Sequence, residues 1–505
     1  MRKRINIWGA GLLSLLLLGA CYDDNGNYNY SDIGTVSLEI TADTTVMYGE
    51  DLKLEPKKIT YQDTSEDQYE WSWELAAKTT SNVPEYKEIA HTKVLDIVNF
   101  QEEIGQYDLR LSAIHKATGV RTMAYCKFTV DNGLSKVYLL LTKQDNGEYD
   151  IDAVTYPGGK KRMNQYSLMN GETIRNAERM FYVNSSFSRD ERLYLAQTEN
   201  GQTLSPIDLT YQGTANDWFF EAPARIHITH ILTDDEARDQ FMICDKGIYY
   251  MNNVNSPLKA NVRCSLQDGT DYSITGVGTM HNSSGRGRYA FYDELNGRFI
   301  EWNFSYGTYY IQPLATATDI AATTFDTQNI GKKKFYTDNS GKEDRLWILF
   351  EDENSDLWLY TFKDGAGVYY NVIIQPSEAP LKLDAEMQEQ FKKATAFCAV
   401  KTADKFYYAV DNKIWIYNAA THKTETEPFY TSPDTNMRFT KIFYRDKDEQ
   451  EITFAGNSNG KGFFYRAKVD YLGRMATPTE EEKEPFKSYD GFGEIKDFIY
   501  KYKNY

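Results

Sequence analysis

The sequence predicts an all-β protein in two parts, a β-sandwich followed by a β-propeller. Aromatic residues are plentiful, with 39 tyrosines among 505 residues, and aromatic side chains favour strands. Long helical periodicity is almost absent. Short hairpins recur along the second part of the chain at intervals of about 45 to 60 residues, the range of propeller repeats. The length also exceeds what one core usually supports, so at least two domains are expected.

The first twenty residues have the three parts of a secretion signal. A basic start precedes an apolar core from Ile7 to Leu18, which is followed by two small residues. The apolar core is shorter than the roughly 20 residues that span a bilayer, and no later segment reaches that length. We therefore expect residues 1–20 to be a removed signal peptide and residues 21–34, rich in Asn, Asp, Gly and Tyr, to be a tether.

The tetrapeptide LGAC that ends at Cys21 resembles the bacterial lipobox, whose cysteine becomes the first mature residue and carries acyl chains. Several acyl chains give durable membrane attachment. The pair Asp23 and Asp24 resembles the export signal of Bacteroidetes lipoproteins. These resemblances imply a lipid anchor on Cys21 in the outer leaflet of the outer membrane, facing the extracellular side. An ordinary cleaved signal with a chance cysteine is the alternative.

The chain is strongly acidic, with a formal net charge of -17. Removing residues 1–20 removes three basic residues and no acidic ones, so the charge becomes -17 - 3 = -20. Nucleic-acid binding needs basic patches that neutralise phosphates, so we expect no nucleic-acid partner. A negative body of this kind is instead held away from an anionic surface.

Four cysteines follow the tether, without any CxxC pair. They are Cys126, Cys244, Cys264 and Cys398. This wide spacing indicates neither a zinc site nor a dense disulfide framework. We expect each of them to be a small buried side chain. A disulfide between Cys244 and Cys264 across neighbouring strands stays open.

Residues 35–131 show strands at short spacing. In YEWSWEL, the side chains of Tyr69, Trp71 and Trp73 share one face, as in a half-buried strand of a sandwich. Tyr107, in GQYDLRL, is similar to the tyrosine corner of immunoglobulin-like sandwiches. The stretches CYDDNGNYNY, YEWSWEL and GQYDLRL resemble the PKD-like domains of Bacteroidetes surface lipoproteins, which implies an immunoglobulin-like sandwich. The usual WDFGDG continuation is replaced by WSWELAAK, so the strand connections stay open.

Residues 132–505 carry seven hairpins, each made of two apolar strands and a polar turn. They begin near residues 137, 193, 240, 289, 346, 406 and 452. Weaker strands between them complete four-stranded blades, whose apolar faces are covered only in a ring. We count seven blades, with six or eight left open. The C-terminal GEIKDFIYKYKNY is expected to return a strand to the first blade, and DAEMQEQFKKA to form a short helix capped by Asp384.

Three motifs suggest chemistry but have structural explanations. GNSNG, residues 456–460, fits the GxSxG nucleophile pattern but lies between two strands, where a hairpin turn is favoured. His227 and His230 are three apart in a strand and therefore point to opposite faces, so a shared metal is not expected. The acidic run EDENSD, residues 351–356, is read as a solvated turn, with calcium binding left open. We predict no metal and no cofactor.

Consecutive aromatic residues are the candidate ligand-binding site. In NDWFFEAP, Trp218, Phe219 and Phe220 follow one another, so at least one would point outward from a strand. Exposed aromatic side chains bind sugar rings and peptide side chains alike. Packing between two blades is the other interpretation. The ligand-binding interpretation extends to three further aromatic residues: Trp302, Tyr309 and Tyr310.

The functional hypothesis depends on the resemblance. Lipid-anchored proteins with a PKD-like domain and a propeller resemble proteins encoded with Sus-type systems, in which a TonB-dependent SusC-like transporter and a SusD-like lipoprotein import oligosaccharides or peptides. The resemblance implies a non-catalytic accessory subunit that binds ligand or scaffolds the transporter. Two alternatives stay open: a propeller glycosidase or lyase that acts on a polysaccharide, and an adhesion or structural protein. No carboxylate pair can be named for the glycosidase.

Overall fold

A computed structural model of the protein describes most of the chain after the tether. The described residues are 35–78, 84–185, 190–233, 239–252, 260–281, 287–302, 310–314, 324–340, 345–364, 374–445, 450–478 and 484–502. Cys21, Asp23 and Asp24, which the sequence predicts for the lipid anchor and its export, lie outside them. Contacts divide the chain into two units, residues 1–131 and 132–505. Within the described ranges, no helix is long and apolar enough to cross a membrane.

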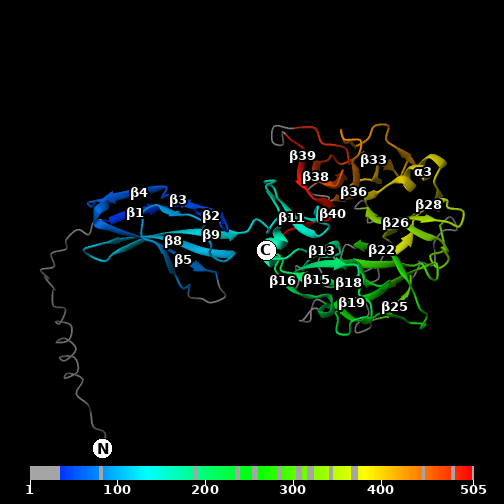
Figure 1. Ribbon diagram of the computed structural model, residues 1–505, viewed down its shortest axis with the longest axis horizontal. Coiled ribbons are helices and arrows are strands. Elements are labelled where there is room, and N and C mark those ends of the chain that lie inside the picture. Colours follow the sequence, from blue (N-terminus) through cyan, green and yellow to red (C-terminus); the bar gives the residue numbers. More distant parts are fainter. Residues whose placement is uncertain are drawn as a thin grey trace, which may run out of the picture. The chain divides into compact units, whose positions relative to one another are not determined.

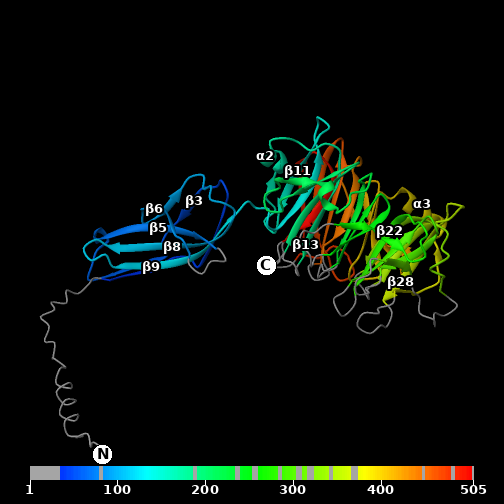
Figure 2. The ribbon, with the colours of Figure 1, turned by 90° about the horizontal axis from the view of Figure 1, so that it is seen from below.

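The first unit is a β-sandwich. Its larger sheet has the order β2 (Asp43–Met47), β9 (Arg121–Asp131), β8 (Gly105–His115), β5 (Tyr69–Ala77) and β6 (Lys87–Ala90). Two smaller sheets pair β1 (Thr35–Glu39) with β4 (Lys58–Gln62), and β3 (Leu52–Leu54) with β7 (Leu95–Ile97). A short 3-10 helix, η1 (Glu66–Gln68), leads into β5. Figure 2 shows β5, β8 and β9 side by side.

The sandwich core confirms the alternation predicted for β5. Trp73 is buried against Leu109 and Leu111 of β8, and Trp71 packs at the edge of the same cluster. Glu74, on the opposite face of β5, accepts a hydrogen bond of 2.7 Å from Arg110 Nε, and this bond lowers the pKa of the Glu74 carboxyl. The hydrophobic period of the strand therefore separates an apolar core from a charged outer pair.

Tyr107 forms the tyrosine corner that its position predicts. Its hydroxyl donates a hydrogen bond of 2.6 Å to the backbone oxygen of Glu103, four residues upstream. The ring itself is buried and contacts Phe128 edge-on. This bond ties the start of β8 to the loop that precedes it.

The described residues of the second unit form seven sheets, in chain order. The first contains β12 (Lys161–Arg162), β11 (Tyr149–Thr155), β10 (Val137–Lys143) and β40 (Glu494–Lys501). The second contains β13 (Ala177–Ser185), β14 (Asp190–Gln197), β15 (Gly201–Leu204) and β16 (Tyr211–Thr214), and the third β17 (Ile228–Thr233), β18 (Asp239–Cys244), β19 (Gly247–Asn252) and β20 (Ala260–Arg263). The fourth contains β21 (Ser265–Leu266), β25 (Tyr310–Pro313), β24 (Arg298–Trp302), β23 (Gly287–Asp293) and β22 (Ile274–His281).

The remaining three sheets complete the unit. The fifth contains β26 (Lys333–Ser340), β27 (Arg345–Glu351), β28 (Leu357–Asp364), β29 (Ile374–Pro376) and β30 (Leu381–Lys382). The sixth contains β31 (Ala396–Ala399), β32 (Lys405–Val410), β33 (Lys413–Asn418), β34 (Lys423–Thr424) and β35 (Tyr430–Thr431). The seventh contains β36 (Arg438–Tyr444), β37 (Glu451–Ser458), β38 (Lys461–Lys468) and β39 (Phe486–Phe492). Each predicted hairpin forms two neighbouring strands in the interior of one sheet.

Apolar clusters between the sheets make the second unit a β-propeller. Each sheet shares a buried cluster with the next, beginning with Leu139 of the first and Leu195 of the second. The seventh sheet shares one with the first, in which Phe464 and Phe498 lie 5.2 Å apart between ring centres. Figure 1 shows the resulting ring, coloured from cyan to red. A sheet that is apolar on both faces needs this arrangement to exclude water from both.

The C-terminal strand closes the ring, as predicted. β40 pairs with β10 in antiparallel register, with Leu139 opposite Ile499. Figure 1 shows β40, in red, beside the cyan first sheet. The closure therefore depends on hydrogen bonds between the two ends of the unit.

A buried polar network reinforces this closure. Glu451 of β37 accepts hydrogen bonds from Arg466 Nη2, at 2.9 Å, and from the hydroxyl of Tyr138, at 2.6 Å. The guanidinium of Arg445 lies 4.0 Å from the ring centre of Tyr156 and 4.1 Å from that of Tyr500. The network joins the seventh sheet to the first through charge-assisted and cation–π contacts.

Two local predictions are confirmed. Helix α3 (Ala385–Lys393) begins after Asp384, whose side chain accepts a bond of 2.8 Å from the backbone N–H of Met387. The GNSNG motif is a hairpin turn, because Asn459 and Gly460, with φ of 50° and 76°, join β37 to β38. A second helix, α2 (Gln165–Asn170), follows the first sheet and lies at the end of β11 in Figure 2.

The four cysteines among the described residues are free and buried. A disulfide between Cys244 and Cys264 is therefore wrong. Cys244 belongs to the cluster between the second and third sheets, and Cys264 to the cluster between the third and fourth, so the thiols lie on opposite faces of one sheet. Burial raises the pKa of Cys244 to about 11 and that of Cys264 to about 12, which keeps both thiols protonated.

Candidate functional site

The innermost strands of the propeller share a repeated irregularity. These strands are β40, β13, β17, β22, β26, β31 and β36, and Figure 1 shows those that it labels nearest the axis of the ring. Six of the seven have a register shift within their first residues as the structure describes them. A β-bulge adds one residue and re-aims the neighbouring side chains. The bulges therefore bring charged side chains to one end of the axis.

A cavity of about 410 Å³ lies among four of these strands. Its lining comes from β13, β17, β36 and β40, and consists of Glu178, Arg179, Met180, Phe181, Tyr182, Ile231, Thr440, Lys441, Lys496, Asp497 and Ile499. The volume falls within the range of small-molecule sites, and the lining mixes apolar side chains with a few charged groups, as such sites do.

One charged pair on the cavity wall is internally satisfied. Lys441 Nζ lies 2.6 Å from Asp497 Oδ1 and donates a second bond of 2.7 Å to the backbone oxygen of Phe498. The other Asp497 oxygen accepts a bond of 2.7 Å from the backbone N–H of Met180. This pair joins β36, β40 and β13 and holds the wall together.

Two further ion pairs lie at the edge of the cavity. Lys496 Nζ lies 2.6 Å from Glu494 Oε1 on the same strand. Glu178 lies 3.3 Å from His227 Nε2, which belongs to the loop before β17. Both carboxylates that line the cavity, Glu178 and Asp497, therefore have partners from the protein.

Arg179 has no such carboxylate. Its side chain is exposed, and Nη1 donates one hydrogen bond of 2.8 Å to the backbone oxygen of Thr229 at the bulge of β17. No ion pair of its guanidinium occurs with any residue that the structure describes. A guanidinium has five N–H donors, so most of its capacity is unused.

Lys334 adds a second positive group beyond the cavity wall, near the neutral ring of His230. Burial, followed by the positive charges of Arg179 and Lys334, lowers the pKa of His230 to about 4, so the ring is neutral at neutral pH. Burial also lowers the pKa of Lys334, although Glu294 opposes this effect. The two histidines singled out by their spacing thus have separate partners, Glu178 for His227 and the Thr229 hydroxyl, 3.0 Å away, for His230.

Gly276 provides the space for the Lys334 side chain. It follows the bulge of β22, where the equivalent residues of β13 and β17 are Arg179 and His230. A Cβ atom at Gly276 would lie 3.1 Å from Lys334 Cγ. The aliphatic part of the Lys334 side chain therefore extends from the fifth sheet over β22, at the position where β22 has a glycine and no side chain.

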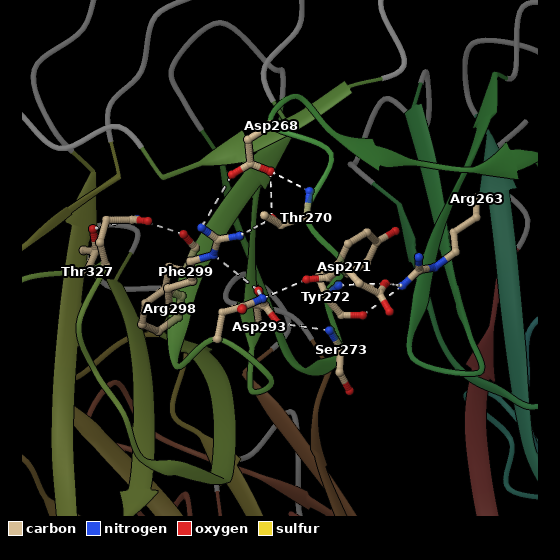
Figure 3. A network of polar contacts seen from close by, with 12 residues as sticks. Arg263, Asp268, Thr270, Asp271, Tyr272, Ser273, Asp293, Arg298, Phe299 and Thr327 are labelled. Carbon is tan, nitrogen blue, oxygen red and sulfur yellow. Dashed lines mark hydrogen bonds and ion pairs between the residues drawn. The ribbon is translucent and has the colours of Figure 1, made fainter.

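A polar network on the fourth sheet fixes the loop that leads into β22 (Figure 3). The buried Asp293 accepts bonds from the Ser273 N–H, at 3.0 Å, and from Asn296 Nδ2, at 2.6 Å. Arg298 lies 3.4 Å from Asp293 and donates a bond of 2.9 Å to the Thr270 hydroxyl. These groups are satisfied by one another, so the network is structural.

The same turn also places a carboxylate near Lys334. Glu294, next to Asp293, accepts a bond of 2.9 Å from the Thr275 hydroxyl and one of 3.2 Å from the Lys334 backbone N–H. The network therefore sets the position of β22 and the start of β26 relative to each other.

The aromatic candidates are corrected by their burial. Trp218, in the short helix η2 (Ala215–Trp218), is 4% exposed, and Phe219 is 2% exposed. Both pack between the second and third sheets, where Trp218 meets Tyr194 edge-on at 4.6 Å. A buried ring makes no contact with a surface ligand, so packing between blades is the interpretation that holds for these two.

Burial also decides the assignment of the other aromatic candidates. Trp302 is 4% exposed and packs between the third and fourth sheets, which corrects its assignment as well. Phe220 is 64% exposed and remains a candidate surface residue. Tyr309, and the side chain of Tyr310, lie outside the described residues.

The acidic turn of residues 351–356 folds around one side chain. Asp352 Oδ1 accepts 2.9 Å bonds from the N–H groups of Asn354 and Asp356, and Oδ2 accepts one of 2.9 Å from Trp358 Nε1. The hydrogen bond from Trp358 is the largest of the effects that lower the pKa of the Asp352 carboxyl. The carboxylate serves the turn, and within the described ranges no group of three His, Cys, Asp or Glu side chains is arranged for a metal.

The charged side chains near the propeller axis, Arg179 and Lys334, were not predicted from the sequence. Arg179 and Lys334 lie in strands whose apolar pattern resembles that of every other blade. Their positions depend on bulges, and an extra residue in a strand leaves no mark in the hydrophobic period. Charged residues within the first three positions of an innermost strand are the one signal that repeats, in β13, β26, β36 and β40.

Comparison with known proteins places the N-terminal part of the chain. A model of the PKD-like family matches residues 21–177, so the match begins at Cys21, covers the sandwich and continues through the first sheet to Ala177. No curated protein matches the chain.

Several solved structures are similar at low identity. A quinonprotein alcohol dehydrogenase-like protein from Bacteroides thetaiotaomicron is 10% identical, with 92% of this chain and 97% of that chain covered and a TM-score of 0.42. The WD40 domain of SCAP from fission yeast is 9% identical (62% and 72%, TM-score 0.38), and PorZ, a surface component of the type-IX secretion system of Porphyromonas gingivalis, is 12% identical (76% and 44%, TM-score 0.33). The propeller assignment rests on the sheets and their packing.

Proposed function

We propose that the chain is a non-catalytic surface lipoprotein of the outer membrane, anchored through Cys21, that serves as an accessory subunit of a SusC/SusD-type uptake complex. The observation that supports the proposal is that two independent patterns begin or end at Cys21. The lipobox pattern makes this cysteine the first mature residue, and the PKD-like match begins at the same residue. Acyl chains on Cys21 supply the membrane attachment.

The propeller supplies the binding platform. Its axial cavity has the size of a small-molecule site, and an oligosaccharide or peptide is the ligand class that the uptake role requires. The two carboxylates in the lining are engaged by Lys441 and His227. A glycosidase needs one carboxyl group that donates a proton and a second that attacks or activates water, so this lining favours binding over hydrolysis.

Anchoring and export are tested together in cells that make the protein. The natural chain is expected to incorporate labelled fatty acid and to be cleaved by protease added to intact cells. Cys21→Ser should abolish the label. Asp23→Asn with Asp24→Asn should keep the label but protect the protein from the added protease, and the matched control, Asn25→Ala with Asn27→Ala, should change neither result.

Two outcomes contradict the proposal. A natural chain that carries no fatty acid would refute the anchor. Release of product from polysaccharide mixtures by the purified protein, lost in a variant of the propeller, would refute the non-catalytic role and favour the glycosidase or lyase.

A further inference from the structure

The geometry of the inner strands points to an oxyanion-binding site at the propeller axis, formed by Arg179 and Lys334 with His230 between them. The proposed occupant is the carboxylate of a small acidic saccharide that enters the cavity beside Arg179. This inference deepens the proposed function and rests on it for the class of ligand, since it states which saccharides the platform holds.

Neither cation has a carboxylate within ion-pair distance among the described residues. Among the ion pairs of the described residues, Lys441 and Lys496 have carboxylate partners at 2.6 Å, whereas Arg179 and Lys334 have none. Glu294 is the carboxylate whose charge acts on Lys334, and it is already engaged by the Thr275 hydroxyl and the Lys334 N–H. The axial cluster thus contains two ion pairs and two positive groups, Arg179 and Lys334, that have no ion pair with a described residue.

Burial and repulsion both disfavour the positive charge of Lys334. Burial is the largest cause that lowers the pKa of Lys334, the charge of Glu294 opposes it, and the charge of Arg179 adds to it; burial and the charges of Arg179 and Lys334 lower the pKa of His230. Repulsion and desolvation both oppose such an arrangement, and charged groups held without a partner are typical of functional sites. A bound oxyanion removes both costs, because it accepts hydrogen bonds from both cations.

The fold makes room for this arrangement. Gly276 occupies the position where the two preceding sheets carry Arg179 and His230, and its lack of a Cβ lets the Lys334 stem pass. The three side chains come from the second, third and fifth sheets, so they meet only in the closed ring. The positive group is also local, since the chain as a whole carries a net charge of -17.

The cavity favours a saccharide acid as the occupant. Its apolar lining includes Phe181 and Ile231, and its polar lining includes the exposed Thr440, so a sugar ring finds both kinds of contact beside the Arg179 guanidinium. Arginine binds a carboxylate through two parallel N–H donors, and its other donors are unused here.

The test is calorimetric titration of the soluble chain, produced with Cys21→Ser, with D-galacturonate and with D-galactose as its neutral counterpart. We expect binding of galacturonate and none of galactose. Arg179→Gln and Lys334→Gln should each raise the Kd for galacturonate by about tenfold, the effect of one lost charged hydrogen bond. Lys393→Gln, on helix α3 and outside the cavity lining, removes the same charge from a residue that already pairs with Glu389 at 2.6 Å, and should change the Kd by less than about twofold.

The outcomes separate this site from the proposed function. Equal binding of galactose, or an equal effect of Lys393→Gln, would overturn the oxyanion site. Binding of inorganic sulfate as tightly as galacturonate would show that no saccharide is recognised and would overturn the ligand class. If galacturonate does not bind but the native protein still co-purifies with a transporter, the oxyanion site is refuted and the accessory role stands. If galacturonate binds but no transporter co-purifies with the protein, the accessory role is refuted and the oxyanion site stands.

Gly276→Ala supplies a second variant that leaves both cations in place. Its φ is not in the left-handed region, but the new Cβ would lie 3.0 Å from Thr337 Oγ1, 3.1 Å from Lys334 Cγ and 3.3 Å from Tyr292 Cβ, so these neighbours must shift slightly. We expect weaker galacturonate binding together with a somewhat lower melting temperature. Unchanged binding would overturn the role assigned to the position of Lys334.

Discussion

The buried carboxyl of Asp152 should make the propeller less stable at high pH. Asp152 lies in β11 and is fully buried. Its oxygens accept bonds of 2.9 Å from the Thr142 hydroxyl and 2.7 Å from the Asn164 N–H. Burial, with a smaller contribution from the charge of Asp150, nevertheless raises its pKa from 3.8 to about 6.

The magnitude follows from that difference. The folded chain binds the Asp152 proton more tightly than the unfolded chain, so the free energy of unfolding falls as pH rises from about 4 to about 6, and the full cost applies above pH 6. At 1.36 kcal/mol for each pKa unit, the difference between 3.8 and about 6 corresponds to about 3 kcal/mol. Asp152→Asn keeps the shape of the side chain and removes the charge, so it should recover up to this amount at pH 8 and almost none at pH 4.

The assay is differential scanning calorimetry of the soluble chain at pH 4, 6 and 8. Asp152→Asn should raise the melting temperature of the propeller transition at pH 8, while the sandwich transition serves as an internal reference. The control is Asp150→Asn, because Asp150 Oδ1 accepts bonds from the N–H groups of Ile151, Tyr166 and Ser167, and its charge should be stabilising. A lower melting temperature for Asp152→Asn at pH 8, or the same gain at pH 4, would refute the reasoning.

The remaining predictions use the same calorimetric assay. Trp218→Ala should cost about 3 to 5 kcal/mol because the ring is buried, whereas Phe220→Ala, at an exposed position, should stay within about 0.5 kcal/mol; equal effects would contradict the assignment of these two rings. Glu451→Gln should cost about 3 to 5 kcal/mol because it leaves Arg466 buried without its partner, and a neutral result would show that the network adds nothing. Deleting β40 should abolish the propeller transition and keep that of the sandwich; a surviving propeller transition would refute closure by this strand.

Much of the fold could be predicted because its determinants are local. The alternation around Trp73, the cap at Asp384 and the turn at Asn459 and Gly460 each depend on a few neighbouring residues, and each is confirmed. The return of the last strand to the first sheet could also be predicted, since an incomplete blade leaves an open edge.

The site could not be predicted in the same way because its determinants are not local. Trp218 is buried by a neighbouring sheet, and consecutive aromatic letters do not reveal which ring the next blade covers. Arg179 and Lys334 come together through three bulged strands and a missing Cβ at Gly276. The period of a strand predicts which face is apolar, but it carries no information on which charged side chains meet across an axis.

The central claim is that the chain belongs to a surface uptake complex and holds ligand for it. The most direct measurement is affinity isolation of the native protein from mild detergent extracts, followed by identification of the proteins that accompany it. We predict a TonB-dependent SusC-like transporter and a SusD-like lipoprotein in amounts comparable to the bait, and their loss in the Cys21→Ser variant, which lacks the proposed anchor. Recovery of the natural protein alone would contradict the claim.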